Sequence, residues 1–171
     1  MGLGEAVDVC PELTMITPDP TRCGQIWESV LGRIEAVGAA VQSPRDGEAF
    51  FEAAGIERLH GGLTGVLDVL EGRLGSSFLI AAAPTRLAAL ALAGEQAEST
   101  GRRNRILPPE ELAGFLGRQP VSILLDRLPG TAAVNRRMLE AMRRLGLGTL
   151  GDLAGLSADA IADRFGPPGL A

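Results

Sequence analysis

The 171-residue chain contains no lysine and no tyrosine, so all 16 of its basic residues are arginines. It has one histidine, His60, and two cysteines, Cys10 and Cys23, which lack the paired spacing that a zinc site requires. No stretch approaches the roughly 18 consecutive apolar residues of a membrane-spanning helix, and the N-terminus lacks the basic-then-apolar pattern of a secretory signal. We therefore expect a cytoplasmic protein without a metal site or a membrane contact.

What is present is ordinary for a globular protein: 46% of the residues are hydrophobic and 22% are charged. The net charge of -5 argues against a wholly basic nucleic-acid binder. The charge is unevenly spread, because residues 1–100 carry 6 Arg and 14 acids whereas residues 101–144 carry 9 Arg and 4 acids. Any contact with a polyanion is therefore expected within residues 101–144.

The first hundred residues alternate between helical and strand periodicity. Asp19 and Pro20 supply an N-cap and a first-turn proline for a helix at about 21–35. Helical spacing of apolar residues recurs in two later segments, 63–74 and 84–97. Short apolar runs predict four strands, at 36–42, 48–52, 77–81 and 105–107. The first two are expected to form a hairpin around the polar turn 43–47. This order favours a ferredoxin-like α+β layer that lacks its first strand.

From Pro108 onward the pattern becomes entirely helical. Apolar residues recur at helical spacing in three segments: 110–116, 121–125 and 134–145. A last helix begins after Ser157, a typical N-cap residue, and ends at Gly166. We predict three regions: a short segment at 1–18, an α+β domain at 19–110 and a helical domain at 111–171.

Six segments together resemble a known family in their amino-acid sequences and in their order along the chain: 2–6, 10–13, 48–50, 81–86, 107–112 and 145–153. The last reads Leu-Gly-Leu-Gly-Thr-Leu-Gly-Asp-Leu and is the strongest single motif. The family is that of the Y-family (translesion) DNA polymerases. The resemblance implies a remnant of the fingers region at 1–18, an incomplete ferredoxin-like palm with an antiparallel sheet, and a small all-helical helix-hairpin-helix thumb.

Residues 55–62, Gly-Ile-Glu-Arg-Leu-His-Gly-Gly, look most similar to the ImuB-type mutasome subunits. Those subunits resemble polymerases but have lost the active site and act as DNA-binding adaptors. The resemblance implies other mutasome proteins and the sliding clamp as partners, reached through regions that this sequence does not contain.

Catalysis by this chain is not expected. Templated nucleotidyl transfer needs two divalent cations held by several carboxylates. The resemblance places Glu48 at one carboxylate position of the family, and the aspartate that precedes it in the family falls on Gly47. Asp46 is one position away, and a shift of one residue along a strand turns the side chain to the opposite face of the sheet. The family's other metal-binding aspartates would precede Met1. We expect Glu48 to be vestigial and the chain to bind no cofactor, whereas an active family member would bind Mg²⁺. The alternative is residual metal binding by Asp46 and Glu48.

A helix-hairpin-helix holds the nucleic-acid backbone without reading sequence, because main-chain N–H groups at the glycine turn approach phosphate oxygens. The resemblance and the charge pattern together give these candidates for DNA contact: Gly146, Gly148, Thr149, Arg136, Arg137, Arg143 and Arg144. The arginines could equally form a solvated helix face that complements the helix C-terminus. Ala132 also replaces the second glycine of the family's Leu-Pro-Gly-x-Gly hairpin.

Three functions remain open from the sequence. The first is a non-catalytic adaptor in translesion synthesis and DNA repair that binds primer-template or single-stranded DNA through its backbone. The second is a truncated portion of an active error-prone DNA polymerase, and the third is a ferredoxin-like interaction domain without a DNA role. A sheet edge left unpaired by the missing strand also predicts a homodimer.

Overall fold

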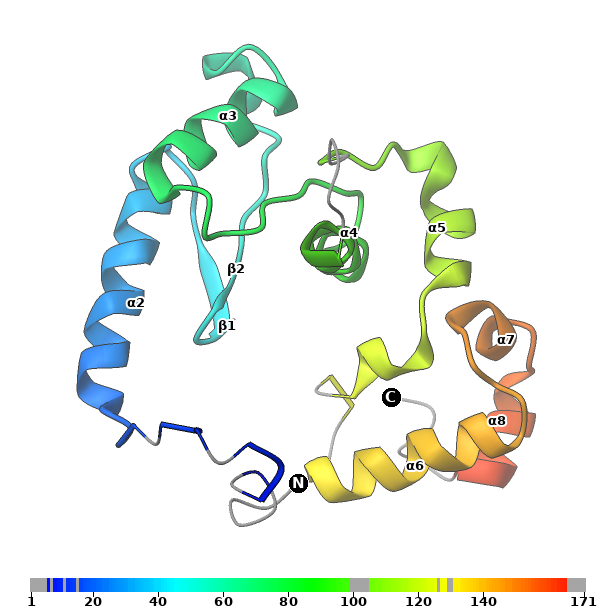
Figure 1. Ribbon diagram of the computed structural model, residues 1–171. Coiled ribbons are helices and arrows are strands. Elements are labelled where there is room, and N and C mark those ends of the chain that lie inside the picture. The colour runs from blue at the N-terminus through cyan, green and yellow to red at the C-terminus, as the bar shows by residue number, and fades with distance from the viewer. Residues whose placement is uncertain are drawn as a thin grey trace. The chain divides into compact units, whose positions relative to one another are not determined.

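The computed structural model describes residues 6, 8–10, 12–14, 16–98, 105–125, 127–128 and 131–165 (Figure 1). The fold is α+β, as predicted, and its helices outnumber the strands of one antiparallel sheet. The chain forms two compact units, 1–51 and 52–171. The predicted division at residues 18 and 110 stays a prediction. In the described ranges no helix is long and apolar enough to cross a membrane.

The first unit contains the predicted N-terminal helix, α2 (Pro20–Glu35). The carboxylate of Asp19 accepts a hydrogen bond from the backbone N–H of Arg22 at 2.9 Å, and Pro20 stands in the first turn, where no intrahelical donor is needed. Val30 and Ile34, one turn apart, are buried. The prediction of a helix at 21–35 is therefore confirmed, including its cap.

A hairpin follows, formed by β1 (Gln42–Arg45) and β2 (Glu48–Phe50). The predicted first strand at 36–42 was wrong, because the strand begins where that range ends, and residues predicted as turn are paired instead. The reason is the backbone of Gly47, whose φ of 87° is the left-handed conformation that a tight turn needs and that glycine adopts freely. The turn is therefore limited to Asp46 and Gly47.

The second unit begins with a short 3-10 turn, η1 (Glu57–Leu59), followed by the predicted helix α3 (Leu63–Leu74). Gly65 lies in the first turn of α3 against the carbonyl oxygen of His60. A Cβ added to Gly65 would stand 1.6 Å from that oxygen, so this position has no room for a side chain. The buried residues of α3 are Val66, Leu67 and Leu70.

The helix predicted at 84–97 is α4 (Arg86–Glu98), and Thr85 caps it through a 3.2 Å hydrogen bond from the N–H of Ala88. The strands predicted on either side of it, 77–81 and 105–107, were wrong. Within the described residues these flanks share one parallel bridge, between Ala82 and Ile106.

Proline explains why that pairing stops. The N–H of Ala82 donates to the carbonyl of Arg105, and the N–H of Leu107 donates to the carbonyl of Ala82, so the next donors in the ladder would be residues 84 and 109. Both are prolines, Pro84 and Pro109, which have no N–H, so the ladder cannot extend in that direction. The described sheet therefore has two strands, and its ferredoxin-like arrangement stays a prediction.

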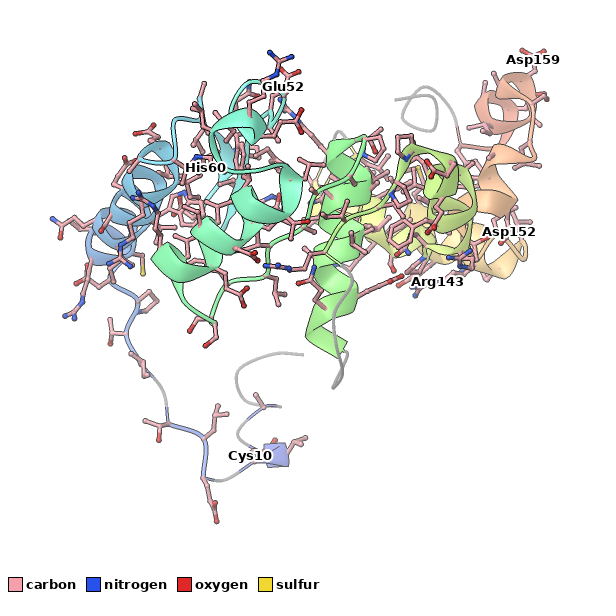
Figure 2. All side chains as sticks on the ribbon, turned by 90° about the horizontal axis from the view of Figure 1, so that it is seen from above. Cys10, Glu52, His60, Arg143, Asp152 and Asp159 are labelled. Atoms are coloured by element: carbon pink, nitrogen blue, oxygen red, sulfur yellow. The ribbon has the colours of Figure 1, made fainter. Side chains whose placement is uncertain are left out.

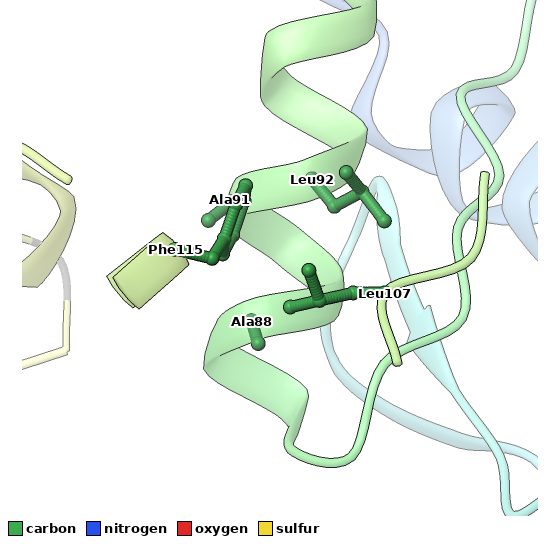
Figure 3. Packing of buried hydrophobic residues seen from close by; sticks show 5 residues of the cluster. All are labelled: Ala88, Ala91, Leu92, Leu107 and Phe115. Carbon is green, nitrogen blue, oxygen red and sulfur yellow. The ribbon is translucent and has the colours of Figure 1, made fainter. Parts of the chain in front are cut away.

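Behind the bridge, α4 packs against α5 (Leu112–Arg118), which follows a 3-10 turn, η2 (Pro109–Glu111), and confirms the helix predicted at 110–116. Figure 3 shows the buried side chains that join the two helices and the bridging segment: Ala88, Ala91, Leu92, Leu107 and Phe115. Two alanines on α4 leave space for the Phe115 ring, which is 5% exposed.

The C-terminal helices share a second core. They are η3 (Val121–Leu124), α6 (Ala132–Arg144), α7 (Leu150–Ala154) and α8 (Ala158–Phe165). The segment predicted as a helix at 121–125 is the 3-10 segment η3, and the helix predicted at 134–145 is α6. Val121, Leu139, Met142 and Leu147 are its buried residues. The Ser157 hydroxyl caps α8 at 3.2 Å as predicted, while the predicted stop at Gly166 lies outside the described residues.

Candidate nucleic-acid interface

Helix α6 presents a buried face and a basic face. Thr131 caps it, and the buried face consists of Asn135, Leu139 and Met142. Four exposed arginines lie on the other side: Arg136, Arg137, Arg143 and Arg144. At 100° per residue these arginines occupy a sector of about 120° that points away from the buried residues. The structure thus brings the four predicted arginines onto one surface.

These arginines are open to a ligand. None of the four makes an ion pair with a residue that the structure describes, and Arg136 makes a 3.4 Å hydrogen bond to the carbonyl of Ala132 in its own helix. Arg105 differs, because its guanidinium is held by Asp68 and by Glu71, the latter at 2.9 Å. Helix α6 therefore carries four exposed arginines that have no ion pair with a described residue.

Asn135 fixes the orientation of this helix. Its side-chain N–H₂ donates to the carbonyls of Leu125 at 3.0 Å and Leu128 at 2.9 Å, so the loop before α6 is bonded to the helix's inner face. Asn135 is 3% exposed, and its Oδ1 has no hydrogen-bond partner among the described residues. Our sequence interpretation missed it, although a polar residue one turn before Leu139 on the apolar stripe was a readable signal.

The turn after α6 does not expose the backbone donors that the resemblance implied. Gly146 has a φ of 81° and ends the helix, with its N–H bonded to the carbonyl of Arg143 at 3.0 Å. The N–H groups of Gly148 and Thr149 both donate to Oδ2 of Asp152, at 3.0 and 2.8 Å, and the Thr149 hydroxyl donates to the same oxygen. A carboxylate of the chain thus accepts the hydrogen bonds of the two N–H groups that the resemblance assigned to a phosphate.

Electrostatics keeps that carboxylate in place. The N–H of Thr149 foremost and then its hydroxyl lower the pKa of Asp152 from its ordinary value. Burial opposes them, and the N–H of Gly148 makes the smallest contribution, which also lowers the pKa. Asp152 therefore stays charged at neutral pH and repels a second anion. Figure 2 labels Arg143 on α6 and Asp152 on α7, the two sides of this turn. The predicted contacts of Gly146, Gly148 and Thr149 with phosphate stay predictions that this arrangement does not favour.

The same turn is bonded to the segment that follows α5. The Val121 N–H donates to the carbonyl of Gly148 at 3.0 Å, and the Leu150 N–H donates to the carbonyl of Gln119 at 2.9 Å. A Cβ on Gly151 would stand 2.8 Å from the carbonyl oxygen of Gly117. The glycine of the Gly-Asp-Leu motif is therefore required by close packing of α7 on α5.

Replacing Asp152 with Asn is expected to lower the melting temperature at pH 7 and to leave DNA affinity unchanged. Because the folded-state pKa is depressed, the stabilisation by Asp152 is present above the unfolded value of about 3.9 and is lost as pH falls through the folded pKa. The gap between the wild type and Asp152→Asn should therefore narrow in thermal melts as pH falls from the unfolded value through the lowered folded-state pKa. The control is Asp163→Asn, on an exposed position of α8. A tighter DNA affinity for Asp152→Asn alone would show that the turn contacts the phosphate.

Glu48, the residue at the family's carboxylate position, is engaged by a cation of its own hairpin. Oε2 of Glu48 lies 3.3 Å from Nε of Arg45, and the two residues are paired across the turn. The Glu48 side chain is 21% exposed. The described residues contain no group of three or more His, Cys, Asp and Glu side chains that could hold a metal ion. A cation binding at Glu48 would compete with the Arg45 guanidinium for this carboxylate.

Comparison with known proteins relates the chain to DNA polymerases. No family model matches it. The chain is 25% identical over 175 residues to DNA polymerase IV of Caulobacter vibrioides, an alignment that covers 99% of this chain and 41% of that protein. It is 26% identical over 170 residues to DNA polymerase IV of Ralstonia nicotianae, with 97% and 45% covered. The chain thus spans less than half the length of these relatives, and its similarity to them extends over nearly the whole of its own length.

Proposed function

We propose that this chain holds DNA by its backbone without synthesising it, as part of a Y-family-like protein of the ImuB type that acts in translesion synthesis and DNA repair. The observation that carries the proposal is the sector of four exposed arginines on α6, in a chain that is similar to DNA polymerases over nearly its whole length.

The arginine face has the chemistry that phosphate recognition requires. Each guanidinium is always charged and can donate two parallel hydrogen bonds to one phosphate. Arg136 and Arg143 are separated by seven residues, about 10.5 Å along the helix axis. A duplex presents one negative charge per roughly 1.7 Å of axis, so a segment of that length offers about six phosphate charges. Four arginines on this length of helix can therefore contact several phosphates at once.

The ion pair of Glu48 supports DNA binding without DNA synthesis. Its carboxylate is paired with Arg45 at 3.3 Å, so the one family carboxylate position in the sequence carries little net charge toward a metal. Nucleotidyl transfer requires two cations and hence several unpaired carboxylates.

The finer architecture belongs to the same proposal. We assign residues 19–110 to an incomplete ferredoxin-like palm and residues 111–171 to a helix-hairpin-helix thumb, in a cytoplasmic protein of the DNA-damage response. Other mutasome proteins and the sliding clamp would bind through further regions. Self-association through the unpaired edge of the β1–β2 hairpin completes the proposal.

Primer extension separates holding from synthesis. Purified chain is mixed with a labelled primer-template, Mg²⁺ and all four deoxynucleotides, and both retention and primer length are measured. We expect the primer-template to be retained in the complex at 50 mM salt with its length unchanged. The names of the relatives, both DNA polymerase IV, favour the second candidate, a portion of an active error-prone polymerase. Incorporation of a single templated nucleotide would establish that candidate instead, and no retention at all would favour an interaction domain without a DNA role.

A further inference from the structure

Helix α6 carries one acidic residue, Glu140, in the middle of its basic face. Arg136 and Arg137 precede Glu140 by four and three positions, and Arg143 and Arg144 follow it by three and four. Residues three or four apart on a helix are surface neighbours, with about 5–6 Å between their Cβ atoms. Glu140 is therefore adjacent to all four arginines and lies at the centre of their sector.

Glu140 is exposed, as its four neighbours are, and makes no ion pair with any residue in the described ranges. Its carboxylate therefore faces the same ligand as the guanidinium groups. A phosphate that approaches this face is near four guanidinium groups and also near the Glu140 carboxylate, which is at a similar distance from the phosphate. The charge of this face toward a polyanion is consequently +3, where the arginines alone would supply +4.

We infer that Glu140 limits the affinity of the α6 arginines for DNA, so that binding to this face stays weak and easily reversed by salt. The inference rests on the proposed function and adds a residue that tunes it. At a separation of about 6 Å in water, removing one like charge from the neighbourhood of one or two phosphates strengthens binding by roughly three- to tenfold. Screening shortens the reach of this effect from about 10 Å at 0.1 M salt to about 3 Å at 1 M.

Glu140 has the opposite effect on the folded state. Glu140 and Arg144 stand in the favourable order for an ion pair four residues apart, and Glu140 offsets repulsion among the arginines. Removing the carboxylate is expected to lower the melting temperature by roughly 1 °C. If Glu140 only stabilised the helix, its replacement would lower both the melting temperature and the DNA affinity. We expect instead that its replacement lowers the melting temperature and raises the DNA affinity.

The test is a fluorescence-anisotropy titration of a labelled 20-base-pair duplex with wild type, Glu140→Gln and Glu28→Gln at 50 and 300 mM salt. Glu28 is an exposed residue in the middle of α2, so the control makes the same change of net charge elsewhere. We expect Glu140→Gln to bind three- to tenfold more tightly at 50 mM, with a smaller gain at 300 mM, and Glu28→Gln to match the wild type. Glu140→Ala, which also retains helix propensity, should repeat the result.

Two outcomes overturn the inference, and they are distinguishable. If the wild type binds with strong salt dependence and neither Glu140 variant binds more tightly than Glu28→Gln, the limiting role of Glu140 is excluded while DNA holding stands. If the wild type does not bind the duplex even at 50 mM salt, the proposed function and the inference fail together.

Discussion

Replacing Arg136 and Arg137 with Glu is expected to weaken duplex binding by about a hundredfold at 50 mM salt, with the folded structure unchanged. Both side chains are exposed and outside the buried stripe of α6, so the core does not depend on them. The double change removes two phosphate contacts and adds two repulsive charges, and each contact of this kind is worth on the order of tenfold in affinity. Anisotropy titration measures the affinity, and circular dichroism confirms the fold.

The matched control reverses two arginines of α2, Arg22→Glu and Arg33→Glu, both exposed. It changes the net charge of the protein by the same amount and leaves α6 intact. We expect its affinity to stay within about threefold of the wild type, because neither Arg22 nor Arg33 belongs to the arginine face of α6 that is proposed to contact phosphate. Equal losses in the two double variants would mean that DNA responds to net charge alone and that α6 has no special role.

Replacing Gly65 with Ala is expected to cause the largest loss of stability among single methyl additions to this chain, about 3 kcal/mol or more. The added Cβ would stand 1.6 Å from the carbonyl oxygen and 2.8 Å from the carbonyl carbon of His60, and both atoms belong to the backbone. Neither can rotate away, so the start of α3 must shift, and with it the buried Val66 and Leu67. Thermal melting should show a decrease of roughly 6–12 °C.

Gly72 on the same helix provides the comparison, because an added Cβ there meets nothing within 4 Å. Gly72→Ala should raise stability by about 1 kcal/mol, since alanine is the better helix former. Opposite shifts for the two substitutions would identify the His60 carbonyl as the cause. A melting temperature for Gly65→Ala at or above the wild-type value would refute the close approach.

The helices were predictable because their signals are local. Asp19 caps α2, Thr85 caps α4 and Ser157 caps α8, each through its own side-chain oxygen. The apolar stripe of α3 also agrees with its buried residues. Such features depend on residues three or four positions apart, which a sequence displays directly. The stripe predicted for α6, Val134, Met138, Met142 and Leu145, was wrong, because of these only Met142 is buried and Val134 and Leu145 are exposed.

The strands were less predictable because pairing depends on distant partners. Residues 77–81 and 105–107 have apolar runs typical of strands, yet their described residues and Ala82 form one bridge, and Pro84 and Pro109 lack the N–H groups of its next rung. In the hairpin, Gly47 determined the place of the turn more strongly than the surrounding polar residues did. Tertiary context overrides strand propensity more readily than helix propensity.

The candidate site divides in the same way. The arginine face of α6 was predictable from helical spacing alone, and the structure brings its four members together. The glycine turn was predicted to offer N–H donors to phosphate, whereas the structure gives those of Gly148 and Thr149 to Asp152. A threonine followed three residues later by an acidic side chain is the signature of a capping box, and that signal favoured the structural role.

The most direct test of DNA holding by α6 is the dependence of duplex affinity on salt, measured for the purified chain from 50 to 200 mM. Four arginine contacts predict that the logarithm of the association constant falls linearly with the logarithm of salt concentration, with a slope between about -2 and -4. The same series with Arg136→Glu and Arg137→Glu should show a slope smaller in magnitude by about 2. A wild-type slope near zero, or no binding at 50 mM salt, would contradict the account.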